Sequence, residues 1–416
     1  MTLFKQIRGN ARACMVVEPL FIIPYSLYVT YASLYMLELG VNEQQIGIIT
    51  SLGLIVQIFS SFISGFLTDR MGRKRTLLLF DLFSWSIATL MWAVSQNFWF
   101  FVVAAIINAF QKVPHIAWTC LIVEDTEPKQ RSMVYTVLQF ITVVGGLFAP
   151  IGGLLVNEMG LISGVRLMYF IAFFSMTAMF IIRHYLTHET AVGVKKRHES
   201  SKMNLKTALA DYVKTGKNLL NNYPLLLIFS IYVLFQFQLT IQNTYLSIYL
   251  IENLSFSQSM IGVFPAFSSV CMLFLLIFVI PRFREEYHLQ YIGIGFSFII
   301  ISSILVITAK SGNMTQIIIS TILSSAGLLL STPYLETAVA NIMEDDSRAN
   351  VSSILQVALL LFISPAGIIG GVTYKIDPRI PFLLMLGAMM ISMVLLSFTM
   401  KLIARNEDRK KKIVDF

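Results

Sequence analysis

Residues 65–75 read GFLTDRMGRKR and lie between two long apolar runs. A cluster of one acid and four bases between two such runs must lie at a membrane surface, because charges are costly inside the hydrocarbon. Gly65 and Gly72 allow two helix ends and a tight turn to approach closely. Asp69 can be held by an arginine or by a helix N-terminus. The bases, which favour the cytoplasmic side of a membrane, are Arg70, Arg73, Lys74 and Arg75.

The composition is that of an all-α membrane protein. The chain has 416 residues, of which 56% are hydrophobic and only 13% are charged, whereas soluble domains carry about 25% charged residues. Twelve spans of about 21 residues would use roughly 250 residues, and only helices or closed barrels satisfy the backbone in lipid. Hydropathy predicts transmembrane helices at 16–38, 47–68, 76–95, 98–123, 133–157, 165–186, 223–250, 260–281, 288–309, 314–341, 350–373 and 380–402.

The charge distribution predicts that both termini are cytoplasmic, in a plasma (inner) membrane. Most of the 31 Lys and Arg then fall in cytoplasmic segments. Because the net charge of +8 is sorted by membrane side, it does not indicate a nucleic-acid partner. The basic start leads into an apolar run too long for a cleavable signal peptide. Three scattered cysteines indicate packing residues and no disulfide framework.

The chain divides into two halves of six spans each. The stretch IVEDTEPKQRSMVYTVLQ (122–139) is echoed by IMEDDSRANVSSILQ (342–356), at the same place in each half. The longest polar stretch, 187–222, predicts a cytoplasmic linker with an amphipathic surface helix. We therefore expect a six-helix bundle over 1–186 and a second over 223–416, which ends in a basic cytoplasmic tail.

The stretch at 65–75 closely resembles the loop between helices 2 and 3 of the major facilitator superfamily of transporters, G-x-L-a-D-r-x-G-r-(k/r)-(k/r). The resemblance implies two pseudo-symmetric bundles that rock around a central cavity in alternating access. It further implies a cytoplasmic latch between the halves in the outward-open state, with charge pairs Glu124–Arg131 and Glu344–Arg348. The alternative is that these residues only set topology. The predicted latch comprises Gly65, Asp69, Arg70, Gly72, Arg73, Lys74, Glu124, Arg131, Glu344 and Arg348.

The same resemblance implies that helices 1, 2, 4 and 5 and their counterparts 7, 8, 10 and 11 line a central cavity, so polar residues on these helices are expected to face the substrate. On helix 7, four amide and phenol side chains share one helical face, which suits a hydroxyl-rich solute. The alternative is that these groups form hydrogen bonds between helices. The predicted cavity residues are Tyr28, Tyr31, Asn108, Gln111, Lys112, His115, Gln139, Gln238, Gln242, Tyr245, Tyr249 and Gln356.

Lys112 is predicted to be the only Lys or Arg deep in a span, where an ammonium group is expensive unless it is paired or wetted. It would attract an anionic group or pair with an acid, for which Glu336 across the cavity is a candidate. The candidate proton carriers are Glu336, His115 and Glu18. Glu18 precedes Pro19 at the predicted start of helix 1, so ordinary solvation at the cytoplasmic rim fits it equally well.

These observations predict a secondary transporter that takes up a small polar organic solute, such as a sugar, a glycoside or an organic anion, by proton symport. Sodium stays open as the coupling ion. The alternative is a proton-coupled drug exporter, because Gly145–Gly153 resembles an antiporter motif in which Ala149 replaces a glycine. The sequence carries no H-E-x-x-H, G-x-S-x-G or Walker A motif, so we expect neither an enzyme, a metal nor a cofactor. The expected partners are substrate, proton and lipid bilayer, and the expected state is a monomer.

Overall fold

The structure is a computed structural model of the chain, and it describes residues 7–199, 223–283, 287–341 and 348–414. Twelve helices in it are long and apolar enough to cross a membrane, which confirms the predicted number of spans. They run over Gly9–Glu38, Glu43–Met71, Arg73–Ala93, Phe98–Glu124, Met133–Met159, Leu161–Leu186, Leu225–Glu252, Gln258–Arg282, Leu289–Thr308, Met314–Glu336, Ile354–Ile376 and Ile380–Leu402.

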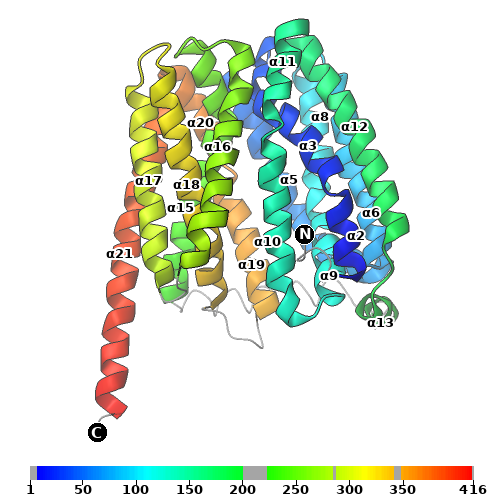
Figure 1. Ribbon diagram of the computed structural model, residues 1–416, viewed down its shortest axis with the longest axis vertical. Coiled ribbons are helices and arrows are strands. Elements are labelled where there is room, and N and C mark those ends of the chain that lie inside the picture. The colour runs from blue at the N-terminus through cyan, green and yellow to red at the C-terminus, as the bar shows by residue number, and fades with distance from the viewer. Residues whose placement is uncertain (1–6, 200–222, 284–286, 342–347, 415–416) are drawn as a thin grey trace.

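The helices form two bundles that stand side by side in Figure 1. The first bundle, called the N half, contains α2 (Gly9–Val17), α3 (Pro19–Tyr28), η1 (Val29–Tyr31), α4 (Ala32–Glu38), α5 (Glu43–Met71), α6 (Arg73–Asp81), η2 (Leu82–Ile87), α7 (Ala88–Ala93), α8 (Phe98–Asn108), η3 (Ala109–Gln111), α9 (Lys112–Glu124), α10 (Pro128–Gly146), α11 (Ala149–Met159) and α12 (Leu161–Leu186). Helix α13 (Ala191–Glu199) follows it, within the predicted linker.

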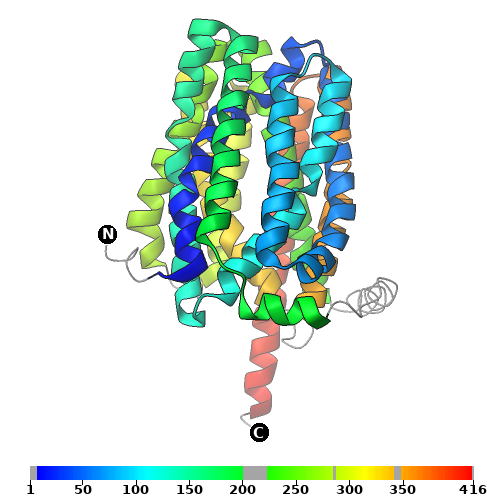
Figure 2. The same ribbon diagram turned by 90° about the vertical axis from the view of Figure 1, so that its right-hand side faces the viewer.

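The second bundle, called the C half, contains α15 (Tyr223–Glu252), η5 (Gln258–Gly262), α16 (Val263–Phe274), η6 (Leu275–Val279), η7 (Ile280–Arg282), α17 (His288–Thr308), α18 (Met314–Asn341), α19 (Arg348–Ile363), α20 (Ala366–Ile376) and α21 (Ile380–Val414). Figure 2 shows the start of α2, the helix α13 and the end of α21 at one end of the molecule. We call that end the terminal end and the opposite end the distal end.

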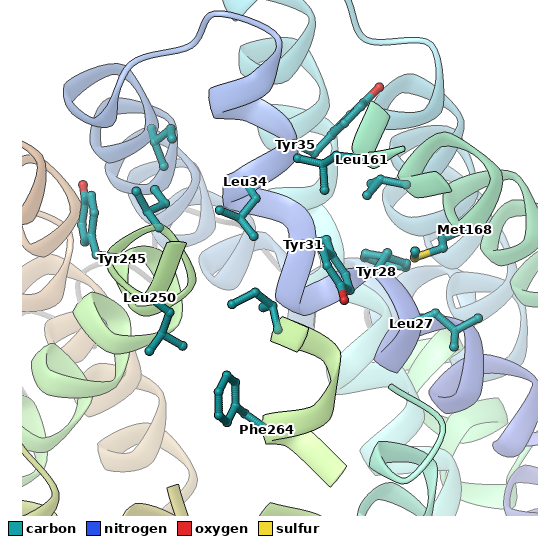
Figure 3. Close-up of a cluster of buried hydrophobic side chains, with 14 of the residues drawn as sticks. Leu27, Tyr28, Tyr31, Leu34, Tyr35, Leu161, Met168, Tyr245, Leu250 and Phe264 are labelled. Carbon is teal, nitrogen blue, oxygen red and sulfur yellow. The ribbon is translucent and has the colours of Figure 1, made fainter. Parts of the chain in front are cut away.

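The two halves are in contact in the distal half of the molecule. Helix α5 packs along α20, and α11 packs on η5. The Gly262 N–H donates to Tyr31 Oη at 3.0 Å, and the Ile368 N–H donates to Ser51 Oγ at 3.0 Å. One buried apolar cluster draws residues from both halves, and Figure 3 shows Tyr31 directed toward the segment that carries Phe264. This distal seal joins the bundles through packing and hydrogen bonds together.

Small residues make the distal seal possible. A Cβ on Gly367 would stand 2.5 Å from the Gly47 carbonyl oxygen, and a Cβ on Gly262 would stand 2.7 Å from the Ala149 carbonyl oxygen. Backbones can approach this closely only where no side chain intervenes. Gly152, in the helix-5 stretch that resembles an antiporter motif, likewise packs against the Leu27 carbonyl. Close packing thus accounts for that glycine.

Candidate functional site

The N half contains a cavity of about 320 Å³ between α2, α3, α6, η2, η3, α9 and α12. We call it the charged cavity. Its volume is in the range of small-molecule sites. The polar side chains that line it are Glu18, Asp81, Gln111, Lys112, His115 and Arg183. Four residues predicted from the sequence are therefore brought together here, namely Glu18, Gln111, Lys112 and His115.

Three of the spans that line the charged cavity change their helical geometry at the lining residues, namely the spans that carry Glu18, Asp81 and Lys112. Glu18 lies at the junction of α2 and α3, directly before Pro19. Asp81 ends α6, where the π-helical turn η2 begins. Lys112 follows the 3-10 turn η3, and Pro114 lies in the next turn. Such irregular turns alter the direction of side chains and recur at functional sites.

A buried ion pair forms one wall of the charged cavity. Arg183 of α12 donates through Nη2 to Asp81 Oδ2 of α6, and only 5% and 8% of the two side chains are exposed. The Arg183 guanidinium also lies over the Phe180 ring, 5.3 Å from its centroid. Both charges are therefore compensated within the wall, which a buried charge requires.

Lys112 and Glu18 are the other two charged groups of this cavity. Among the described residues, Lys112 forms no ion pair and no hydrogen bond through its side chain. Glu18 Oε2 is buried without a hydrogen-bond partner in the described part of the chain. Arg183 attracts Glu18, but Asp81 repels it. Glu18 and Lys112 therefore line the cavity without an ion-pair partner among the described residues.

A second cavity of about 240 Å³ adjoins the first, because Trp85 and Gln111 line both. We call it the aromatic cavity. Predicted residues Tyr28 and Asn108 line it. Asn108 donates through Nδ2 to the Ser84 carbonyl at 3.0 Å, and its Oδ1 accepts from Gln111 Nε2 at 3.0 Å. The remaining walls are apolar, and their aromatic members are Tyr25, Trp92, Phe101 and Tyr169. Flat apolar groups would find stacking partners here.

The predicted stripe on helix 7 lies in α15 and lines neither of these two cavities. Gln238 Nε2 donates to Gln242 Oε1, and Gln242 Nε2 donates to Ser324 Oγ of α18 at 3.1 Å. Tyr245 Oη donates to the Gly367 carbonyl at 2.8 Å, and its ring stacks on Tyr374. Gln242 and Tyr245 thus form hydrogen bonds between helices, as the alternative interpretation expected, whereas the bond between Gln238 and Gln242 lies within α15.

Other predicted cavity residues also lie elsewhere. Tyr31 belongs to the distal seal, where it accepts from Gly262. Tyr249 is fully buried and packs on Phe382. Gln139 and Gln356 are exposed and line neither cavity. A helical face identifies which residues share a side, but it does not say whether that side meets a cavity, a helix or lipid.

The charged loop at 65–75 joins elements of the N half at the terminal end. Arg73 Nη1 donates to Asp69 Oδ1 at 2.8 Å, and Arg73 Nη2 donates to Glu124 Oε1 at 3.0 Å. Glu124 binds Arg73 and Thr190 in this structure and forms no ion pair with Arg131 among the described residues; the Glu124–Arg131 pair expected in the outward-open state stays a prediction. Arg131 Nε is buried without a hydrogen-bond partner among the described residues.

The rest of the latch stays a prediction. Glu344 lies outside the described residues, and the side chain of Arg348 is not among those described. Gly72 adopts a φ of 88° between α5 and α6, a conformation that favours glycine. Gly65 and Arg70 are exposed, and Lys74 donates its backbone N–H to Glu189 at 3.2 Å. The described contacts of this loop lie on one half, so they do not test a latch between halves.

Two predictions about depth are wrong. Glu18 does not lie at the start of helix 1, because the first span begins at Gly9 and carries Glu18 inside it. Lys112 is not the only basic residue within a span, because Arg183 lies in the span Leu161–Leu186; Arg183 is buried, whereas Lys112 is partly exposed. Glu336 is exposed, lines neither cavity and forms no ion pair with Lys112 in the described structure.

Asp81 and Arg183 were not predicted from the sequence as site residues. The signal that could have found them is that each is a charged residue within an apolar run.

The chain resembles known proteins both in sequence and in fold. A sequence model described as Major Facilitator Superfamily matches residues 20–285. The chain belongs to this superfamily. A superfamily relative, the "uncharacterized MFS-type transporter YqjV" of Bacillus subtilis (strain 168), is 28% identical over 131 residues. That match spans 31% of this chain and 32% of the length of the relative.

Solved structures share the superfamily fold over nearly the whole chain. A mutant of the nucleoside transporter NupG has a TM-score of 0.71 at 15% identity, covering 94% of this chain and all of that one. A POT family transporter in complex with a thioalcohol-conjugated peptide has a TM-score of 0.70 at 14% identity, with 97% and 99% covered. The human organic anion transporter MFSD10 (TETRAN) has a TM-score of 0.64 at 16% identity, with 92% and 99% covered. The chain is thus a membrane transporter by family, and these structures are alike in fold.

Proposed function

We propose that this superfamily member is a proton-coupled secondary transporter that takes up a small organic solute carrying an anionic group. We further propose that it resides in the plasma membrane with its terminal end in the cytoplasm. The observation that carries the substrate class is Lys112, which lines the charged cavity without an acidic partner among the described residues. An uncompensated ammonium at such depth favours an anionic ligand.

The neighbouring cavity refines the kind of solute. Its aromatic walls, with Tyr28, Trp92 and Tyr169 among them, favour a flat or apolar portion beside the anionic group. An organic anion fits this combination better than a sugar, whose hydroxyl groups would find few partners there. The proteins of similar structure are a nucleoside transporter, an organic anion transporter and a POT family transporter bound to a conjugated peptide, and these compounds are all small polar solutes.

Coupling to protons is supported by the groups that share the cavity with Lys112. Glu18 and His115 both line it, and carboxyl and imidazole groups are the side chains that exchange protons across a transport cycle. Alternating access would then proceed by rocking of the two halves about the cavity. The distal seal corresponds to the part of the cycle in which the extracellular side is closed.

Uptake by proteoliposomes tests the proposal. Purified protein would be screened by thermal shift against organic anions, sugars and cationic drugs, because ligands of the native state raise its melting temperature. The best ligand would then be added to proteoliposomes that contain a pH-sensitive dye. We expect an anion to stabilise the protein and to carry protons inward with it. Stabilisation by lipophilic cations alone, or uptake without proton movement, would contradict the proposal.

The variant Lys112→Gln supplies the decisive comparison. It keeps a side chain of similar length and removes the charge, so we expect at least a tenfold loss of anion affinity with normal folding. Lys310→Gln is the matched control, because Lys310 is exposed at the distal end of α17. Equal affinity in Lys112→Gln and Lys310→Gln would exclude Lys112 from substrate binding.

A further inference from the structure

We propose that the substrate of the charged cavity is a zwitterion, in which Lys112 binds the anionic group and Glu18 binds a cationic amine. The inference rests on the proposed function and narrows its substrate class. Two observations support it. Four charged side chains line the charged cavity, and two of them, Lys112 and Glu18, form no ion pair with each other.

The four charged groups of the cavity fall into two kinds. Asp81 and Arg183 are buried and bonded to each other, so neither requires a ligand. Lys112 and Glu18 have no such partner among the described residues, and no ion pair joins them to each other. The charged residues of the cavity therefore balance as a set, while one cation and one anion stay uncompensated.

The unmatched pair selects the ligand by its charges. A monoanion would neutralise Lys112 but leave Glu18 without a counter-charge, and a monocation would do the reverse. Leaving a charge uncompensated in a poorly hydrated site is costly. A zwitterion pairs its anionic group with Lys112 and its cationic group with Glu18, so every charge of the ligand and of these two side chains has a counter-charge.

The positions of the two groups also allow a ligand between them. Glu18 comes from the junction of α2 and α3, whereas Lys112 comes from the junction of η3 and α9. They line a common space of about 320 Å³, which suits a molecule of amino-acid or slightly larger size. The ring of Trp85 also lines it, and an ammonium group is attracted to the face of such a ring.

The ion pair in the wall contributes to this selectivity. Because Arg183 is engaged by Asp81, it offers little net attraction to an incoming carboxylate, and Asp81 offers little to an amine. Glu18 forms no ion pair with Arg183 in the described structure, and its Oε2 has no hydrogen-bond partner among the described residues. The assignment of Glu18 to the substrate amine leaves His115 as the proton carrier of this cavity.

Equilibrium binding to the full-length protein in detergent tests the inference without any ion gradient. The probes are phenylalanine, β-alanine, γ-aminobutyrate and 6-aminohexanoate, which separate amine and carboxylate by different distances. Each probe is compared with its N-acetyl form, which lacks the positive charge, and with its methyl ester, which lacks the negative charge. We expect at least one probe to bind about thirtyfold more tightly than either capped form, the effect of leaving one buried charge unpaired.

Charge-removing variants assign each half of the ligand to its residue. Glu18→Gln should lose the discrimination between the probe and its N-acetyl form but keep discrimination against the ester. Lys112→Gln should show the opposite pattern. Glu158→Gln is a matched control, because Glu158 is an exposed acid in α11, and Glu18→Asp should retain part of the amine preference. Monodisperse elution in size-exclusion chromatography verifies that each variant is folded.

The outcomes separate this inference from the proposed function. N-acetyl forms that bind as tightly as the free probes would overturn the zwitterion while leaving organic-anion transport intact. Unchanged amine discrimination in Glu18→Gln, or no binding by any probe, would also overturn it. Failure of the proposed function has a different signature, which is binding or uptake without movement of protons in proteoliposomes.

Discussion

At the scale of single residues, the N half is distinguished by charges that a membrane interior penalises. Asp81 and Arg183 neutralise each other, whereas Lys112 and Glu18 do not. Under the proposed function, structural pairing and ligand binding are divided between these two sets of side chains in one cavity. Removing one member of the paired set should affect stability, and removing a member of the unpaired set should affect binding.

The ion pair predicts an asymmetric response to mutation. Arg183→Gln removes the cation that is bonded to Asp81, so this buried carboxylate loses its counter-charge; the expected cost is about 3 kcal/mol. The loss should be smaller at pH 5 than at pH 8, because protonated carboxyl groups need no cation. Thermal unfolding of the purified variant at both pH values measures this. Arg379→Gln, at an exposed distal residue, should behave as wild type.

A companion variant guards against a general loss of folding. The double variant Arg183→Gln with Asp81→Asn removes both charges and should recover much of the lost stability, because an uncharged pair costs less than a broken one. If the double variant is less stable than Arg183→Gln alone, the ion pair does not act through charge compensation.

The loop at 65–75 predicts an effect on turnover and not on folding. In Asp69→Asn, Arg73 keeps its bond to Glu124 at 3.0 Å, so the α5–α6 turn should stay intact. Under the latch hypothesis, transport should fall below a tenth of the wild-type rate because the outward-open state loses its cytoplasmic lock. Uptake into proteoliposomes at matched protein levels measures it. Normal turnover would remove Asp69 from the latch, and Glu127→Gln is the control at a nearby exposed acid.

At the scale of helices, the site is built where regular geometry is interrupted. The proline after Glu18, the π-helical turn after Asp81 and the 3-10 turn before Lys112 all border the charged cavity. Elsewhere, glycines determine how closely helices of opposite halves approach. Gly47 on α5 faces Gly367 on α20, and a Cβ added to Gly47 would stand 2.5 Å from Tyr245 Oη.

This contact predicts that Gly47→Ala weakens the distal seal. The added methyl group must push α5 away from α20, so the population closed at the distal end should fall. Spin labels at Glu38→Cys and Lys375→Cys, in a background without the native cysteines, report the distal distance between halves. We expect a longer distance in Gly47→Ala.

Gly53→Ala is the matched control on the same helix, because a Cβ at Gly53 meets no atom within 4 Å. Its distance distribution should equal that of wild type, and its helix should be slightly more stable, since alanine is the better helix former. If both variants widen the distal distance equally, the Gly47–Gly367 contact does not hold the seal.

At the scale of the whole molecule, two bundles meet at the distal end, and the chain enters and leaves at the terminal end (Figure 1). The positive-inside rule predicts that this terminal end lies in the cytoplasm. Alkaline phosphatase fused after Lys310 should therefore be active, and the same reporter fused after Arg75 or Arg197 should be inactive. The reverse pattern of activity would invert the proposed topology and, with it, the assignment of the distal seal to the extracellular side.

The number and type of elements could be predicted from the sequence because hydropathy acts locally. A run of about 20 apolar residues must be a helix in lipid wherever it lies in the fold. The twelve predicted spans were confirmed, and the loop at 65–75 identified the family. Boundaries were less certain, as at the first span, which begins at Gly9 and so carries Glu18 into the bundle.

The sequence by itself determined a twelve-helix transporter of the Major Facilitator Superfamily with polar residues on particular helical faces. Only the tertiary structure decided which of those faces meet. It brought Glu18, Lys112 and His115 to one cavity with Asp81 and Arg183. It placed Tyr31 and Tyr245 where the two halves meet, with hydrogen bonds to Gly262 and to the Glu43 carbonyl. The reason is that periodicity fixes the rotation of a side chain about its own helix, whereas the neighbour it meets depends on packing between helices distant in sequence.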